Sequence, residues 1–201
     1  MSAPAWPFGH LRMFGYDLVM IDPAWPFDLW SNAGNEKSPA AQYDCMTREQ
    51  ILALPVGQLL RAGGVLWLWA TWPLVAEGFH SECLKSWGLS GKTGGAWAKR
   101  TRHGRLRWGT GYLLRSVCEP FIIATIGSER DYDGAAECNL IETAGQRLLD
   151  GLARQHSRKP DEAYAVCERV MPMAWRADVF SRQRREKWDC WGLEVDKFNA
   201  V

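Results

Sequence analysis

The sequence predicts a single α/β domain built on a mostly parallel sheet flanked by helices. Two observations lead to this fold class: short apolar runs typical of strands buried on both faces, and amphipathic segments between them. A chain of 201 residues, 47% of them hydrophobic, is long enough for one cored domain. We therefore expect one domain over residues 1–201.

The expected elements follow in chain order. The strands are YDLVMI at 16–21, VLWLWAT at 65–71, EPFIIATIG at 119–127 and RADVFSR at 176–182. A helical region at 47–63 starts at the capping residue Thr47, and a second helix at 159–171 has a proline in its first turn. Ligands of such sheets bind at the carboxyl ends of the strands, which places Asp22 in the ligand crevice.

Three segments do not fit regular structure: about 28–42, 99–115 and 128–157. Loops of this length in a compact domain are usually functional or mobile. The second one has no acid and interleaves Trp108 and Tyr112 with six cations: Lys99, Arg100, Arg102, Arg105, Arg107 and Arg115. It is either a solvated charged loop or a loop that contacts nucleic-acid phosphates, and we favour the second interpretation.

Composition and residue spacing argue against several classes of function. A formal net charge of +1 gives no global attraction to polyanions or membranes. Neither the six cysteines nor the four histidines have metal-ligand spacing, so we expect no metal. The longest nearly apolar stretch, 63–76, is too short to span a bilayer, and the amino terminus lacks a secretory signal. We expect a cytoplasmic protein.

The segment YDLVMIDPAWPF ends an apolar strand on Asp22, and it allows two interpretations. One is a common turn after a strand, because Asp-Pro often starts turns, with aromatic core residues following it. The other is a slot for a flat amine, in which an aromatic ring stacks on a base while Asp22 and the carbonyl of Pro23 accept its N–H bonds. Such a slot would bind an adenine or a cytosine that has left its stack.

Beyond this motif, six further segments recur in the order typical of one family. They are YDCMTREQILALPV, GGVLWLWAT, AWAK, GTGYLLRSVCEPFIIATIG, HSRKPDEAYAVCERV and RADVFSRQRREKWDCWGLE. Together with DPAW they resemble the MT-A70 family of S-adenosylmethionine-dependent adenine N-6 methyltransferases, whose signature is D-P-P-W. The resemblance runs from about Tyr16 to Gly192 and implies a Rossmann-like methyltransferase fold in permuted order, with the amine-binding motif before the cofactor segment.

The resemblance also implies roles for individual residues. Asp22 and the Pro23 carbonyl would orient the adenine amine, and Trp25 would stack on the ring. Ala24 stands where the family usually has a second proline, which keeps the volume small but gives up rigidity. Tyr43 and Glu119 match positions near the target base, although Tyr43 could equally be a packing residue and Glu119 a strand-edge acid. The expected substrate set also includes Lys99, Arg100, Arg105 and Arg107, which are assigned from the charge of their loop and not from the resemblance.

The cofactor implied is S-adenosylmethionine, held without a G-x-G-x-x-G loop and largely by the last third of the chain. Lys159 would meet its carboxylate, and Glu194 lies in the tail that would close over it. Leu193 replaces an asparagine that family members commonly carry. The residues 159 and 182–187 also fit a solvated helix start and an exposed charged loop. The implied cofactor set is Asp22, Lys159, Asp178, Arg182, Arg184, Arg185 and Glu194.

From these residues we expect an adenine N-6 methyltransferase acting on nucleic acid. DNA is favoured over RNA, because the chain resembles compact bacterial or phage members. The alternatives are an RNA adenosine methyltransferase and a catalytically silent subunit that binds nucleic acid. A homodimer or a partner subunit is possible for any of the three.

Overall fold

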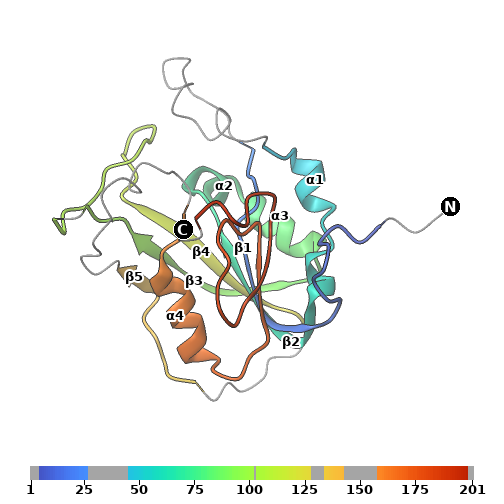
Figure 1. Cartoon of the computed structure of the whole chain (residues 1–201). Helices are drawn as coiled ribbons and strands as arrows, with labels where there is room; N and C mark the ends of the chain where they lie inside the picture. Colours follow the sequence, from blue (N-terminus) through green and yellow to red (C-terminus); the bar gives the residue numbers. More distant parts are fainter. Residues whose placement is uncertain (1–4, 27–44, 102, 128–133, 143–157, 199–201) are drawn as a thin grey trace.

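The structure is a computed structural model that describes residues 5–26, 45–101, 103–127, 134–142 and 158–198. Its centre is a seven-stranded sheet in the order β5-β3-β4-β2-β1-β6-β7 (Figure 1). The strands are β1 (Tyr16–Ile21), β2 (Leu60–Trp69), β3 (Ser90–Ala98), β4 (Cys118–Thr125), β5 (Leu140–Glu142), β6 (Arg176–Val179) and β7 (Asp189–Trp191). Within this part of the chain, none of the helices is long and apolar enough to cross a membrane.

Side chains of β1 alternate between the two faces of the sheet, as a strand buried on both sides requires. Val19 and Ile21 of β1 join a core that includes residues of α1 (Arg48–Leu52), α2 (Trp72–Glu77) and α3 (Phe79–Ser86). Leu18 and Met20 join a second core with α4 (Asp161–Val170). The sheet is therefore covered by helices on both faces, and the predicted single α/β domain is confirmed.

The sheet is mixed, with parallel pairs in the majority. β1 runs parallel to β2 and β6, β6 to β7, and β3 to β5. β4 is antiparallel to both β2 and β3. Because β4 runs backwards, its first residues lie at the same edge of the sheet as the carboxyl ends of β1, β2 and β6.

The four predicted strands are present, but three others come from segments for which no strand was expected. β3 is the sequence SGKTGGAWA, β5 lies inside the predicted loop 128–157, and β7 lies in the carboxyl-terminal tail. The helical region expected at 47–63 was too long. α1 ends at Leu52, and a 3-10 turn over Val56–Leu59 follows Pro55, whose missing N–H and fixed φ stop the helix.

The predicted loop 99–115 contains a small hairpin. An antiparallel bridge joins Arg100 to Leu106, and the Arg107 N–H donates to the Lys99 carbonyl at 2.7 Å. The predicted loop 28–42 lies outside the described residues, as does 128–157 apart from 134–142.

Candidate active site

The site forms where three acids meet at one edge of the sheet. Asp22 directly follows β1, and its N–H points to the Val179 carbonyl at the end of β6, 3.4 Å away. Asp178 lies within β6, and Glu119 lies at the start of the reversed strand β4. The sheet topology thus gathers carboxylates that are far apart in sequence.

Lys159, just before α4, joins two of these acids. Its Nζ lies 3.0 Å from Asp22 Oδ2 and also forms an ion pair with Glu119. Glu119 is shared in turn with Lys99, at 2.8 Å. The Lys159 side chain is only 8% exposed, and its ammonium lies 5.1 Å from the ring centre of Trp69. The four charges alternate in sign along this cluster.

The two carboxylates that share Lys159 differ in basicity. Burial raises the pKa of Asp22, and the single ammonium of Lys159 offsets this only in part, while the Glu119 charge adds to the rise. Burial also raises the pKa of Glu119, but the ammonium groups of Lys159 and Lys99 outweigh it and bring that pKa to about 2. Burial lowers the pKa of Lys159, yet its two carboxylate partners leave it above the ordinary value.

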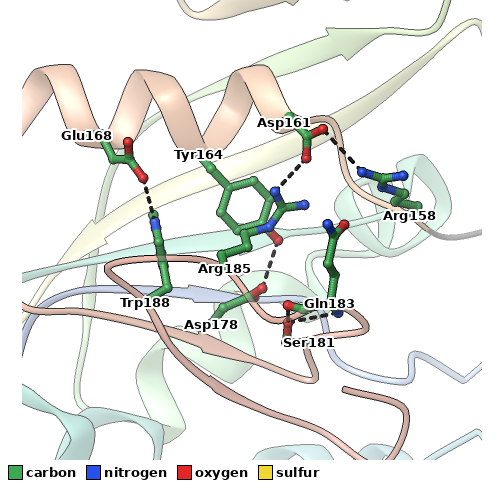
Figure 2. Close-up of polar contacts among 9 residues, drawn as sticks. All are labelled: Arg158, Asp161, Tyr164, Glu168, Asp178, Ser181, Gln183, Arg185 and Trp188. Carbon is green, nitrogen blue, oxygen red and sulfur yellow. Dashed lines mark hydrogen bonds and ion pairs between the residues drawn. The ribbon is translucent and has the colours of Figure 1, made fainter. Parts of the chain in front are cut away.

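A second polar cluster lies between α4 and the chain after β6 (Figure 2). The hydroxyl of Tyr164 donates to Asp178 Oδ2 at 2.9 Å. The guanidinium of Arg185 lies 3.6 Å above the Tyr164 ring and pairs with Asp161 at 2.5 Å. Burial raises the pKa of Asp178 to about 6, although hydrogen bonds from Ser181 and Tyr164 act in the opposite direction.

A pocket joins the two clusters, and the carboxyl-terminal tail closes one side of it. Arg182 forms an ion pair with Glu194 of the tail, and the Phe198 N–H donates to the Arg182 carbonyl at 3.1 Å. Phe180 takes a left-handed conformation, with φ of 62°, where the chain turns out of β6. The pocket is lined by Asp22, Trp69, Arg158, Lys159, Tyr164, Asp178, Phe180, Ser181, Arg182, Gln183, Arg185 and Phe198.

The residues after Asp22 are held by backbone hydrogen bonds. The Pro23 carbonyl accepts from the Trp25 N–H at 2.7 Å, and one lone pair of that oxygen remains for a ligand. The Trp25 indole is 7% exposed, meets Phe79 edge to face and donates to the Trp69 carbonyl at 3.2 Å. Its ring belongs to the core and has little free surface, so the stacking role stays a prediction.

The structure brings most of the expected cofactor residues together, and among the expected substrate residues it pairs Lys99 with Glu119 at 2.8 Å. Among the cofactor set, Arg184 lies apart from the pocket, in an exposed ion pair with Asp196 at 2.6 Å. Arg100, Arg105 and Arg107 lie on the hairpin beyond β3. Tyr43 lies outside the described residues.

No role was expected for Tyr164, Gln183 or Phe198, which also line the pocket. Tyr164 lies on the apolar face of α4 and is typical of a core aromatic. Tyr164 follows Asp161 by three residues in the predicted helix, so the two side chains lie on one face of that helix. This spacing was the only sequence signal that the Tyr164 hydroxyl lies at the edge of the sheet that carries the site.

The comparisons with known proteins agree with this architecture. The model of the MT-A70 family matches residues 16–194, from β1 to Glu194 of the closing tail. The chain belongs to the MT-A70 family. Its relatives include an N(6)-adenosine-methyltransferase MT-A70-like protein of Drosophila melanogaster, 26% identical over 92% of this chain and 28% of that protein.

Two human relatives match the same region. The N(6)-adenosine-methyltransferase catalytic subunit METTL3 is 25% identical over 92% of this chain and 29% of its own length. The N(6)-adenine-specific methyltransferase METTL4 is 24% identical over 92% of this chain and 39% of its own length. The chain therefore spans well under half of these MT-A70 relatives.

Proposed function

We propose that this chain transfers a methyl group from S-adenosylmethionine to the N-6 amine of adenine in nucleic acid. The observation that carries the proposal is the position of Asp22. Its carboxylate follows β1, lines the pocket and is 21% exposed, so it can accept a hydrogen bond from a ligand. Family membership and the names of the relatives support the reaction type.

The pocket residues fit the proposed methyl donor. Two buried polar atoms in its wall, Gln183 Oε1 and Arg185 Nε, have no hydrogen-bond partner among the described residues. Such atoms are costly unless a ligand or water satisfies them. S-adenosylmethionine carries a carboxylate, an ammonium, a ribose diol and a purine, and the pocket offers cations and acceptors for each polar part. When bound, it supplies a methyl group already activated by the positive sulfur.

The side chains of this site then act by orientation. Asp22 accepts one N–H of the amine, and the remaining lone pair of the Pro23 carbonyl accepts the other. Two acceptors drawing on these bonds favour a pyramidal nitrogen, and positioning of this kind supplies about 7–11 kcal/mol in well-aligned reactions. Lys159 has three donors, of which Asp22 and Glu119 take two, so one remains for an anionic ligand group.

The two carboxylates are not equivalent as proton acceptors. Glu119, with a pKa of about 2, is a poor base at neutral pH. Asp22 is the more basic of the two, because burial raises its pKa and it has one ammonium neighbour where Glu119 has two. Asp22 is therefore the stronger hydrogen-bond acceptor of the two and orients the amine, and the proton released after transfer passes to water.

The test is methyl transfer from radiolabelled S-adenosylmethionine by Asp22→Ala. We expect at least a 100-fold fall in turnover, since removing one preorganised contact costs about 10²–10³ in rate. Calorimetric binding of S-adenosylmethionine should stay within a few-fold of the wild type. Glu77→Ala, which removes an exposed carboxylate of α2, is the matched control. Turnover retained within tenfold would contradict the role of Asp22, and a wild type that binds no S-adenosylmethionine would favour a silent subunit.

The finer proposal is that the adenine lies in DNA. It rests on the resemblance to compact bacterial or phage members and not on a contact in the site. Matched DNA and RNA oligonucleotides of random sequence, assayed in parallel, distinguish the two substrates. Faster transfer to RNA would make the protein an RNA adenosine methyltransferase.

A further inference from the structure

The segment between β3 and β4, residues 99–117, presents large apolar side chains to solvent. Tyr112, Leu113 and Leu114 are 83–85% exposed, and Trp108 is 64% exposed. A side chain on Gly111 would place its Cβ 2.0 Å from the Leu114 carbonyl oxygen, so this tight turn needs a glycine. Contiguous exposed apolar surface of this kind marks interaction sites. We refer to residues 99–117 as the β3–β4 loop.

Backbone hydrogen bonds give this loop a defined shape. The Lys99 N–H donates to the Val117 carbonyl at 2.9 Å and closes its base. The Gly109 N–H donates to the Ser116 carbonyl at 2.7 Å, and the Ser116 N–H donates to the Thr110 carbonyl at 3.0 Å, which together close a second lobe. In Figure 1 this yellow-green chain extends away from the sheet beyond β3 and β4. The exposed side chains are therefore displayed on an ordered support.

The loop is connected to the candidate active site at its base. Lys99 pairs with Glu119, which shares Lys159 with Asp22. A ligand lying along the loop therefore approaches the same edge of the sheet at which Asp22 is placed.

The charge of the loop selects among possible partners. Residues 99–115 carry six Lys or Arg and no acid. Arg115 places its guanidinium 5.5 Å from the ring centre of Trp108 and donates to the Gly109 carbonyl at 2.9 Å. Cations interleaved with exposed aromatic rings are typical of surfaces that hold phosphates and stack bases. A symmetric contact between two copies would instead bring two basic loops together, which is unfavourable.

We propose that the β3–β4 loop binds single-stranded nucleic acid beside the target base, with bases stacked on Trp108 and Tyr112 and phosphates held by the loop cations. Stacking of this kind reads no sequence, because every base has a flat face. The inference deepens the proposed function by naming the strand that accompanies the target adenine. It rests on the proposed function, and binding by the loop is measured separately from methyl transfer.

The experiment uses a fluorescein-labelled oligo(dT) 20-mer and fluorescence anisotropy with the full chain. The probe contains no adenine, so its binding does not require the Asp22 site. Because stacking is worth about 1–3 kcal/mol per base, Trp108→Ala should weaken binding about 5-fold or more. Trp108→Phe should restore most of the affinity. Trp175→Ala is the matched control, because that tryptophan is 54% exposed and precedes β6 at the opposite edge of the sheet.

A second variant separates phosphate contacts from stacking. Arg105→Ala should lower the slope of log affinity against log salt by about 0.7, the value for one phosphate of a single strand. Unchanged binding by Trp108→Ala and an unchanged salt slope for Arg105→Ala would each overturn the proposal.

Two further outcomes are informative. If Leu113→Ser/Leu114→Ser abolishes self-association of the wild type, measured by light scattering, while oligo(dT) binding is intact, the loop is an interface between copies and the proposal is wrong. Asp22→Ala should bind oligo(dT) as the wild type does. A failure of methyl transfer and a failure of loop binding are thus seen in different measurements.

Discussion

Removal of the Lys159 ammonium should destabilise the fold strongly at neutral pH. Lys159→Met keeps most of the side-chain volume but leaves Asp22 and Glu119 as neighbouring carboxylates in a pocket wall. These two side chains are only 21% and 16% exposed, so water screens their repulsion poorly. Lys99 remains beside Glu119 alone.

The geometry sets the size of the effect. At the 3.0 Å that separates Lys159 Nζ from Asp22 Oδ2, the Coulomb attraction is roughly 5 kcal/mol for an effective dielectric constant of about 20. The substitution also removes the cost of burying the ammonium, which offsets part of this value. Breaking a buried pair from one side costs about 3–5 kcal/mol in practice. For a domain of this size, that lowers Tm by roughly 6–20 °C.

The pH dependence separates this explanation from a general packing defect. In the wild type the pKa of Glu119 is about 2, below its ordinary value, so its ionised form stabilises the fold above about pH 4.5, and that stability is lost as pH falls toward 2. Without Lys159 the pKa values of both carboxyls rise. Each then opposes folding while ionised, and protonation relieves the repulsion as pH falls.

Urea unfolding followed by circular dichroism at pH 7.5 and pH 5.0 measures the difference in unfolding free energy between wild type and Lys159→Met. This difference should be largest at pH 7.5 and clearly smaller at pH 5.0. Lys85→Met, which removes an exposed lysine of α3, should change stability by less than about 0.5 kcal/mol. A difference below about 1 kcal/mol at pH 7.5, or an equal difference at both pH values, would refute the reasoning.

Two other substitutions test the second polar cluster and the sheet. The raised pKa of Asp178, about 6, means that the folded state holds this proton more tightly, so wild-type stability falls as pH rises from about 4 to 6. Over the same pH range, the unfolding free energy of Asp178→Asn should rise by up to about 3 kcal/mol relative to that of the wild type, as measured by urea unfolding. If the two unfolding free energies change in parallel with pH, the raised pKa of Asp178 is contradicted. Gly95→Ala would place a Cβ 1.9 Å from the Asn139 carbonyl oxygen and should cost about 1–3 kcal/mol in thermal unfolding, while Gly91→Ala, whose Cβ meets only a side chain at 3.4 Å, should be near neutral. Equal losses for the two glycines would show that the β3–β5 contact is not the cause.

The local sequence pattern was sufficient to predict α4 and the strands β1, β2, β4 and β6. The apolar run of β1 is buried at every position, so composition alone identifies it. β3 is different, since its three glycines and its lysine are typical of a loop. Pairing with β4 along its length makes it a strand, and no short stretch of sequence encodes that distant partner. Pro55 marked the end of α1 in the sequence, and the amphipathic pattern on both sides of it obscured that signal.

The sequence predicted the position of those site residues that lie in or next to a predicted strand or at the start of a predicted helix. Asp22 and Asp178 follow from the strands that carry them, and Lys159 from the start of α4. The ion pair between Lys159 and Asp22 was not predicted, because it needs the relative placement of two elements 137 residues apart in the chain. Burial of Trp25 fits the alternative in which aromatic core residues follow the turn, and its packing partner Phe79 comes from α3. Sequence places residues on elements, and tertiary packing then decides which way a long side chain faces.

The same packing bears on the alanine that replaces the second proline of the family signature. A proline would restrict φ at position 24 and remove a donor, so alanine leaves this turn more freedom in the unfolded chain. In the folded chain, hydrogen bonds limit that freedom on both sides. The Ala24 carbonyl accepts from the Met46 N–H at 2.8 Å, and the Trp25 N–H is engaged by the Pro23 carbonyl at 2.7 Å. Alanine at position 24 therefore makes the unfolded chain more flexible. In the folded chain, the hydrogen bonds and the buried Trp25 hold the turn that follows Asp22 in one conformation.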